Sequence, residues 1–483
     1  MMRLFAPMLL VVAVALQALA ITMALVGFLS LHLATGNASD FFLSALICSG
    51  FGVGIFSFGW VSRTEHLFTR QMFLITTGTW LVVPVFASLP LIFTTTHLTF
   101  TDAVFETVSG LTTTGSTVLS HLESQPPDIL LWRSLLQWQG GIGIVCMAVA
   151  LLPFLKVGGM RLFQTESSYW SDENAPRAKH LVITILKIYV LLTALCTAGY
   201  ALTGMSFFDA VNNAFTTIST GGYSTTDRSF GDTSYLTQWV AVVFMVAGSI
   251  PFVLYLQLFK ARFREFFANT QLRTFLLLLG SFILLVSLDL YLSGHDGLMA
   301  SVSKSAFNVT SLITTTGYAS DDYALWGNFS VALIFFAMFI GGCSGSTAGG
   351  TKIFRLQLFG TLLKEQLRRA VHPNITIAST YEGKQVKAEV VTAMVAYFFV
   401  MIMSLIILTL GLSLTELDLI SSLTGASTAL MNVGPGLGDI IGPTGNFSSL
   451  TDGAKWLLCA GMILGRLEFL TILTLFTASF WRG

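Results

Sequence analysis

A short polar turn that contains a glycine recurs four times along the chain, each time behind a short apolar run. The clearest copy is Thr112-Thr113-Thr114-Gly115-Ser116, whose glycine lies thirteen residues after Asp102. Three further pairs keep the same interval: Asp209 and Gly222, Lys304 and Gly317, and Ser421 and Gly434. Four copies at one interval predict a fourfold pseudo-repeat, so the chain is limited to folds with four equivalent units.

Each turn follows a mostly apolar run of about nine residues, whereas a helix needs about 20 residues to cross the hydrocarbon core of a membrane. The four runs cover residues 103–111, 210–218, 305–313 and 422–430. We therefore expect half-helices that enter the membrane and turn back. The carbonyl groups at the end of such a half-helix are tolerated at membrane depth only where they line a cavity filled with water or ions.

The turns are predicted to form a selectivity filter. Glycine adopts backbone angles that let successive carbonyl groups face one axis, and rings of such oxygens can replace the hydration shell of a monovalent cation. The alternative is an ordinary loop rich in Thr and Gly, but four copies at one interval argue against it. The candidate cation-binding residues are Thr113, Thr114, Gly115, Thr220, Gly221, Gly222, Thr315, Thr316, Gly317, Asn432, Val433 and Gly434.

The composition indicates a membrane protein. Hydrophobic residues make up 54% of the chain, charged residues make up 10%, and the net charge at pH 7 is zero. We expect an all-helical integral membrane protein in the lipid bilayer, and no nucleic acid as a partner because a clustered basic face is missing. Arg3 and the apolar run after it resemble a signal peptide, but the run continues to Leu31. A retained membrane helix is therefore expected.

Ten full spans and four half-helices are predicted. Two spans, 7–31 and 41–61, lie outside the repeat in residues 1–70. The four pore units that follow cover residues 71–180, 181–273, 274–388 and 389–483, and each contains an outer span, a half-helix, a polar turn and an inner span. The predicted outer spans are 71–93, 181–203, 274–292 and 390–412, and the inner spans are 130–155, 236–259, 329–355 and 455–480.

The loops between units are rich in Lys and Arg. Because short loops of this kind stay in the cytoplasm, we expect both termini to be cytoplasmic and the four turns to face outward. The basic residues are Lys156, Arg161, Arg177 and Lys179 in the first loop, Lys260, Arg262, Arg264 and Arg273 in the second, and Lys364, Arg368, Arg369, Lys384 and Lys387 in the third.

The third inner span contains a glycine-rich stretch from Gly341 to Gly350. Each Gly inside a helix costs about 1 kcal/mol relative to Ala, so we expect the span to break into an intramembrane loop. The order Gly350-Thr351-Lys352 differs from that of a phosphate-binding loop, and no strand precedes it. The candidate gate residues in this loop are Gly341, Gly342, Gly345, Ser346, Gly349 and Gly350.

Charged residues also occur inside the predicted membrane segments. Arg466 lies near the middle of the last predicted span, where a charge usually marks a pathway or an ion pair. A purely structural pair with a buried acid or with loop carbonyls is the alternative. Asp102 and Asp209 begin half-helices, where the helix dipole favours a carboxylate. We interpret them as capping residues, and attraction of cations is the alternative. Lys304 occupies the equivalent place in the third unit, where its charge opposes the dipole, and the sequence offers no reason for it.

Four motifs resemble a known family. They are Leu135-Leu136-Gln137-Trp138-Gln139-Gly140-Gly141-Ile142-Gly143, the stretch from Gly341 to Gly350, Asn432-Val433-Gly434-Pro435-Gly436-Leu437-Gly438, and Gly465-Arg466-Leu467-Glu468. On these motifs the chain resembles the TrkH, KtrB and HKT potassium-translocating subunits, and most closely TrkH, over nearly all of its length.

The resemblance implies potassium uptake in a bacterial inner membrane, with K⁺ as the transported ion. It implies a loop gate below the filter and a barrier to cations at Arg466, which faces the pore in the family. A glycine in the first turn, here Gly115, goes with potassium preference and a serine with sodium. It also implies a homodimer with one pore per protomer and a TrkA-type cytoplasmic regulatory subunit that binds the nucleotide, so we expect none to be bound by this chain.

Two other functions remain open at this point. A sodium-permeable or proton-coupled cation symporter would have the same fold, and the departure of Asn432-Val433-Gly434 from Thr-rich chemistry allows it. A membrane-embedded enzyme is the alternative from another class. The sequence lacks an HExxH zinc motif and a GxSxG motif with a partner His, so we expect no enzyme activity.

Overall fold

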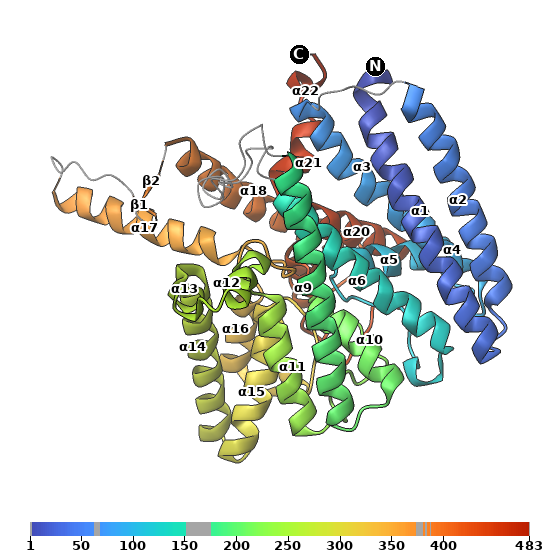
Figure 1. Ribbon diagram of the computed structural model, residues 1–483. Helices are drawn as coiled ribbons and strands as arrows, with labels where there is room; N and C mark the ends of the chain where they lie inside the picture. Colours follow the sequence, from blue (N-terminus) through green and yellow to red (C-terminus); the bar gives the residue numbers. More distant parts are fainter. Residues whose placement is uncertain are drawn as a thin grey trace.

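The computed structural model describes residues 2–61, 68–150, 175–372, 380–381, 384–386 and 388–482, and the chain in these ranges is predominantly helical. The predicted all-helical membrane fold is confirmed. A short antiparallel pair, β1 (Thr380–Tyr381) with β2 (Lys384–Gln385), is the strand structure in the described ranges. It follows the long helix α17, which projects from the helical body in Figure 1.

Two helices precede the repeat. They are α1 (Met2–Leu33) and α2 (Ala38–Val61), which pack side by side at one edge of the molecule (Figure 1). Large apolar side chains on their outer faces, such as Phe28 and Leu46, are exposed. Exposed apolar side chains along a span of this length face lipid when the helix lies in a bilayer.

The outer and pore helices of the four units occur in the predicted order. The outer helices are α3 (Thr69–Ala87) continued by α4 (Leu89–Phe93), α9 (Ala175–Leu202), α14 (Thr270–Leu292) and α18 (Ala388–Ser413). The pore helices are α5 (Phe100–Leu111), α10 (Phe207–Ile218), α15 (Leu298–Ile313) and α19 (Leu419–Met431). In the described ranges, six continuous segments are long and apolar enough to cross a membrane, namely α1, α2, the α3 and α4 pair, α9, α14 and α18.

The inner helices are less regular than predicted. The first is α6 (Pro127–Ala150), whose predicted end at 155 lies outside the described residues. The inner spans predicted at 236–259 and 455–480 are each interrupted by a sharp bend. The second unit bends by 93° between α11 (Tyr235–Gly248) and Phe252–Phe259, and the fourth by 109° between α20 (Asp452–Arg466) and α21 (Phe469–Leu475). The break in the second unit contains Pro251, which has no amide hydrogen to continue a helix.

The third inner span breaks as predicted. It consists of α16 (Asn328–Ala337), a loop through residues 338–352, and α17 (Ile353–Val371). Short helices connect or end the units: η1 (Leu122–Ser124), η3 (Phe252–Leu254), α12 (Tyr255–Phe259), α13 (Phe263–Ala268), η4 (Tyr323–Leu325) and α22 (Ala478–Arg482). Both chain termini lie at the same end of the molecule in Figure 1. Among the basic residues predicted to be cytoplasmic, Lys156, Arg161 and Lys387 lie outside the described residues.

The N-termini of the pore helices explain their charged residues. Asp102 is the third residue of α5, and its amide donates to the N-cap hydroxyl of Thr99 at 3.2 Å. The amide of Asp209 donates in the same way to Ser206 in the second unit, at 3.1 Å. The same hydroxyls also donate to the carboxylates, at 2.8 Å from Thr99 to Asp102 and 2.5 Å from Ser206 to Asp209, so both carboxylates take part in the capped helix start, in agreement with the capping interpretation. Asp102 additionally accepts a hydrogen bond from Lys455 at 2.6 Å, which ties the first unit to the fourth.

Lys304 does not begin its helix. Lys304 was predicted at the start of the third half-helix, but α15 begins at Leu298, so Lys304 lies in the second turn. Its ammonium group lies 2.8 Å from a carboxylate oxygen of Asp296 and 2.8 Å from one of Asp321. Partial burial alone would raise the pKa of Asp321, but the hydrogen bond and charge of Lys304 hold this pKa below its ordinary value. The two carboxylates therefore offset the positive charge that the sequence left unexplained.

Glycines let the inner helices approach the ends of the pore helices. A Cβ atom on Gly140 of α6 would lie 1.9 Å from the carbonyl oxygen of Leu111, the last residue of α5. In the fourth unit, a Cβ on Gly465 would lie 2.0 Å from the carbonyl oxygen of Leu430. At such distances a methyl group cannot be accommodated without moving a backbone. Gly140 in the motif of α6 and Gly465 in the fourth unit are therefore needed for packing.

We expect Gly140→Ala to destabilise the protein by about 1–3 kcal/mol, because the added methyl group overpacks the contact between α5 and α6. Gly143→Ala is the matched control in the same helix, since a Cβ there meets its nearest neighbour, Trp80, at 4.0 Å. Thermal unfolding in detergent measures both. Equal melting temperatures for the two variants would contradict the close approach at Gly140.

Candidate functional site

The four polar turns share one backbone conformation. Each has a left-handed non-glycine residue, at φ of 53° for Thr113, 52° for Thr220, 56° for Thr315 and 55° for Asn432. Two residues later each has a glycine with positive φ, at 90° for Gly115, 80° for Gly222, 83° for Gly317 and 104° for Gly434. Non-glycine residues adopt positive φ uncommonly. The degenerate segment Asn432-Val433-Gly434 is therefore a fourth copy of the same turn.

Hydrogen bonds at the pore-helix ends repeat as well. The Thr113 amide donates to the carbonyl three residues before it at 3.0 Å, and the Thr114 amide to the carbonyl five residues before it at 2.9 Å. The other turns keep both bonds, from Thr220 and Gly221, from Thr315 and Thr316, and from Asn432 and Val433. These bonds satisfy carbonyl groups at the helix ends and fix how the chain leaves each pore helix.

The glycines close the four turns into a ring. A Cβ atom on each one would collide with the carbonyl oxygen that precedes the glycine of the next unit. From the built Cβ to the carbonyl oxygen, the distances are 2.3 Å for Gly115 and Gly221, 1.9 Å for Gly222 and Thr316, 2.0 Å for Gly317 and Val433, and 2.6 Å for Gly434 and Thr114. The contacts run from the first unit through the fourth and return to the first. The structure therefore brings the twelve predicted residues together around one axis.

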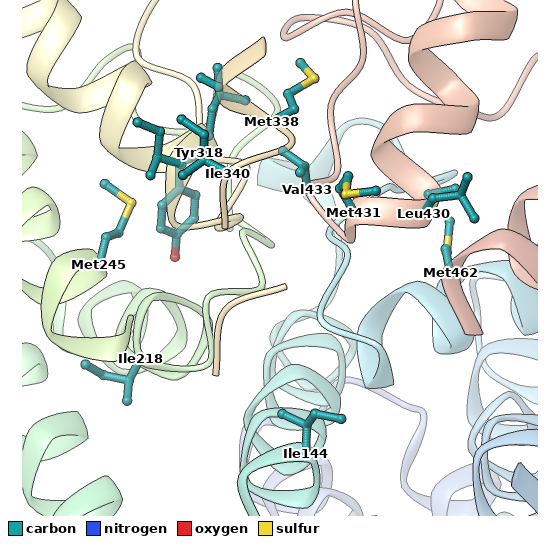
Figure 2. Close-up of a cluster of buried hydrophobic side chains, with 14 of the residues drawn as sticks. Ile144, Ile218, Met245, Tyr318, Met338, Ile340, Leu430, Met431, Val433 and Met462 are labelled. Carbon is teal, nitrogen blue, oxygen red and sulfur yellow. The ribbon is translucent and has the colours of Figure 1, made fainter. Parts of the chain in front are cut away.

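Apolar side chains surround this ring. Figure 2 shows Ile144 of the first unit, Ile218 of the second, Tyr318 of the third and Met462 of the fourth in one buried cluster around the turns. The carbonyl groups of Thr114, Gly221, Thr316 and Val433 thus lie in a buried ring, between these apolar side chains and the buried polar residues of the turns. Such a ring of carbonyl oxygens can take the place of the water around a monovalent cation.

The glycine-rich loop doubles back on itself. Positive φ values of 75°, 76° and 74° occur at Gly341, Gly345 and Gly350. A Cβ on Gly350 would lie 2.5 Å from the Cα of Gly341, so the two ends of the loop touch. A Cβ on Gly342 would lie 2.6 Å from the side chain of Ala348, and Ser346 donates its hydroxyl to the Cys343 carbonyl at 2.6 Å.

The loop is bonded to the ends of three pore helices. The Thr347 hydroxyl lies within hydrogen-bond distance of the carbonyls of Ile218, at 3.0 Å, and Gly248, at 2.9 Å. The Gly349 amide donates to the hydroxyl of Thr315 at 2.6 Å. The Gly350 amide donates to the carbonyl of Met431, which precedes the fourth turn, at 3.0 Å. The loop therefore lies against the start of the turns in the second, third and fourth units.

Arg466 contacts this loop. It was predicted near the middle of the last span, and the structure shows that this span bends there, because α20 ends at Arg466. Its Nη2 donates to the carbonyl of Thr347 at 2.8 Å, and its side chain is buried. Glu468 lies beyond the helix end at a φ of 64°. Its carboxylate pairs with Arg355 of α17, not with Arg466.

A cluster of buried positive charge surrounds the loop. The Arg355 guanidinium is paired with Glu468 and lies 3.9 Å from the centre of the Tyr397 ring. Lys352 donates to the Ala348 carbonyl. A cavity of about 30 Å³ is lined by loop residues together with Lys352, Arg466 and Glu468. In the described ranges, neither Lys352 nor Arg466 has a carboxylate within 4.0 Å, so basic side chains outnumber acidic ones around the loop.

A buried ion pair behind the ring was missed from the sequence. Glu106 of α5 and Arg133 of α6 lie 2.7 Å apart and are 0% and 1% exposed. Glu106 also accepts from the Val118 amide at 2.9 Å, and the Arg133 guanidinium lies 4.2 Å from the centre of the Tyr223 ring. The pair holds the segments that follow the first and second turns. The sequence did contain a sign of this pair, because both charged residues fall inside predicted membrane segments.

The comparisons with known proteins agree on one family. The family model described as TrkH, cation transport protein, matches residues 47–482. The Trk system potassium uptake protein TrkI of Halomonas elongata is 44% identical, over 100% of this chain and 98% of its own length. The Trk system potassium uptake protein TrkH of Escherichia coli K12 is 36% identical, over 88% of this chain and 89% of its own length.

A solved structure has the same fold. The crystal structure of the potassium transporter TrkH from Vibrio parahaemolyticus matches with a TM-score of 0.90 and 32% sequence identity. The match covers 99% of this chain and 100% of that chain.

We expect Glu106→Gln to destabilise the protein by about 3–5 kcal/mol, because it leaves the buried guanidinium of Arg133 without a counter-charge. Asp232→Asn is the control. It removes an exposed pair with Arg228, which is worth at most about 1 kcal/mol. Thermal unfolding of the two variants in one detergent gives the comparison, and a Glu106→Gln variant as stable as the control would argue against a charged pair at this site.

Proposed function

The chain belongs to the TrkH family of cation transport proteins, and from this premise we propose that it takes up potassium across the membrane as the translocating subunit of a Trk-type system. The family is one of transporters, so the chain is a multi-pass membrane protein and not an enzyme. The observation that carries the proposal is the closed ring of glycine and carbonyl contacts among the four turns.

The twelve turn residues form the selectivity filter in this proposal, and K⁺ is its transported ion. Backbone carbonyl groups coordinate the ion, chiefly those of Thr114, Gly221, Thr316 and Val433, which meet in the ring. A potassium preference is supported by the glycine at 115, which leaves the neighbouring Gly221 carbonyl undisturbed. Each of the four units, residues 71–180, 181–273, 274–388 and 389–483, supplies one turn, and residues 1–70 add two peripheral helices.

The loop from Gly341 to Gly350 serves as the gate, together with Arg466. Its bonds to the pore-helix ends at Ile218, Thr315 and Met431 support a position across the cytoplasmic exit of the filter. Glycines 341, 342, 345, 349 and 350 allow its compact path, and Ser346 braces it. The positive charge of Arg466 opposes a cation that leaves the filter, since unit charges a few ångströms apart interact by roughly 4 kcal/mol at an effective dielectric near 20.

We place the protein in the bacterial inner membrane with both termini in the cytoplasm. The common end of the two termini (Figure 1) supports this arrangement. The relatives are named as parts of a Trk system, and a TrkA-type regulatory subunit that binds the nucleotide is the cytoplasmic partner in this proposal. The protein itself is a homodimer with one pore in each protomer.

Rubidium flux into liposomes that contain the purified protein tests the function. We expect flux that potassium inhibits and that persists without a proton gradient. The sodium-permeable or proton-coupled alternative is favoured by one observation, the Val433 that replaces threonine in the fourth turn. Equal inhibition by sodium, or flux that requires the proton gradient, would support that alternative.

Gly115→Ser is expected to admit sodium. Any Cβ at this position lies 2.3 Å from the carbonyl oxygen of Gly221, so the serine must displace that carbonyl from the ring. Bi-ionic reversal potentials measure the ratio of potassium to sodium permeability. Gly54→Ser is the control, because a Cβ at Gly54 in α2 meets no heavy atom within 4 Å. A ratio that stays the same in the Gly115 variant would exclude this glycine from the filter.

Arg466→Ala is expected to increase flux and to leave the protein folded, because its guanidinium bonds to a loop carbonyl and strands no carboxylate when removed. Arg466→Lys should retain most of the barrier, since the charge is kept. Arg355→Ala provides the contrast, because it leaves the acid Glu468 unpaired and should lower stability by about 3–5 kcal/mol.

Flux and thermal stability are measured on the same preparations of these variants. An Arg466→Ala protein with low flux and a lower melting temperature than the parent would assign the residue a structural role and remove it from the gate.

A further inference from the structure

The four turns are equivalent in their backbone but not in their side chains. The residue that precedes the ring glycine is Thr114 in the first unit, Thr316 in the third and Val433 in the fourth. The second unit has Gly221 at this place, followed directly by Gly222. A peptide group between two glycines has more accessible conformations than one next to a β-branched residue. The second carbonyl of the ring is therefore the one that its own segment holds least firmly.

A side chain from another unit occupies the vacant place. A Cβ atom on Gly221 would lie 2.4 Å from both Cδ and Oε1 of Gln137, a residue of α6 in the first unit. Gln137 is completely buried. Its carboxamide thus stands where the side chain of a threonine or valine lies in the other three turns.

The carboxamide is bonded on both sides of the Gly221–Gly222 segment. Its Nε2 donates to the carbonyl oxygen of Gly221 at 2.6 Å. Its Oε1 accepts from the amide of Tyr223 at 3.0 Å. Because a carbonyl oxygen has two lone pairs, the bond to Nε2 leaves Gly221 able to accept a second partner. The Gln137 side chain therefore fixes the direction of this carbonyl while leaving it available to an ion.

This carbonyl belongs to the ring itself. The oxygen of Gly221 is the one that lies 2.3 Å from a Cβ built on Gly115. In the described ranges, no side chain donates a comparable hydrogen bond to the carbonyls of Thr114, Thr316 or Val433. A side-chain hydrogen bond to a ring carbonyl thus occurs in the second unit, whose turn has two successive glycines.

We propose that Gln137 is a positioning residue that replaces the side chain missing at Gly221, holds the Gly221 carbonyl in the coordination ring, and thereby helps to set the selectivity for the transported cation. The inference deepens the proposed function and rests on the assignment of the turns as a filter. It predicts that Gln137 and Gly221 depend on each other, because one side chain fills the space that the other residue leaves.

The test compares permeability ratios of potassium to sodium in liposomes. Gln137→Ala and the similarly sized Gln137→Met should each lower the ratio by about fivefold, the factor that one lost hydrogen bond gives. Gln139→Ala is the matched control two residues along α6, since Gln139 bonds to Thr22 of α1 at 2.7 Å. This control should keep the parent ratio. Melting temperatures identify variants that fail to fold.

Exchange of the two side chains is the decisive arm. Gly221→Thr alone should impair transport, because the threonine collides with Gln137. In the Gln137→Ala background the same threonine finds the space empty and matches the first and third turns. The double variant should therefore recover a ratio within about twofold of the parent, which is strong coupling between neighbouring sites.

The outcomes separate this inference from the filter assignment. If Gly115→Ser changes the ratio while Gln137→Ala and Gln137→Met keep it, the filter stands and the role of Gln137 is overturned. A lower ratio for Ala but an unchanged one for Met would assign Gln137 to space filling and overturn its hydrogen-bond role. A double variant no better than its two single variants also overturns the inference. If Gly115→Ser keeps the ratio as well, both proposals fail.

Discussion

The fold depends on one contact that occurs four times, the approach of a glycine Cα to the carbonyl oxygen of the next turn. No other residue type fits, because a Cβ would lie between 1.9 and 2.6 Å from that oxygen. The contact also requires positive φ at each glycine, which glycine adopts at little cost. The four units can therefore close around an axis with a carbonyl oxygen of one turn against the glycine of its neighbour.

The surrounding helices serve this contact. Gly140 and Gly465 bring inner helices against the carbonyl ends of the pore helices, and the Glu106 and Arg133 pair holds the chain that leaves the first two turns. Thr99 and Ser206 cap the N-termini of the pore helices α5 and α10. A re-entrant helix has no span of its own to anchor it, so its position is set by these lateral contacts.

Symmetry in the backbone coexists with asymmetry in the side chains. The left-handed residue of the third turn, Thr315, accepts the loop amide of Gly349, whereas the hydroxyl of Thr113 in the first turn has no hydrogen-bond partner in the described ranges. In the second turn, Gln137 supplies the side chain that Gly221 lacks. A pseudo-fourfold ring in a single chain can thus be contacted by the glycine-rich loop in one turn and have separate support for one carbonyl in another.

The sequence by itself determined the fold class, the order of the outer and pore helices, the four turns and the break at Gly341 to Gly350. These features are local, since they follow from hydropathy, segment length and the backbone freedom of glycine. The tertiary structure alone decided the contacts between units. The bends after Gly248 and at Arg466, the partner of Glu468 and the two acids around Lys304 all depend on residues distant in sequence. The same holds for Gln137, because its role arises from a vacancy 84 positions away, at Gly221.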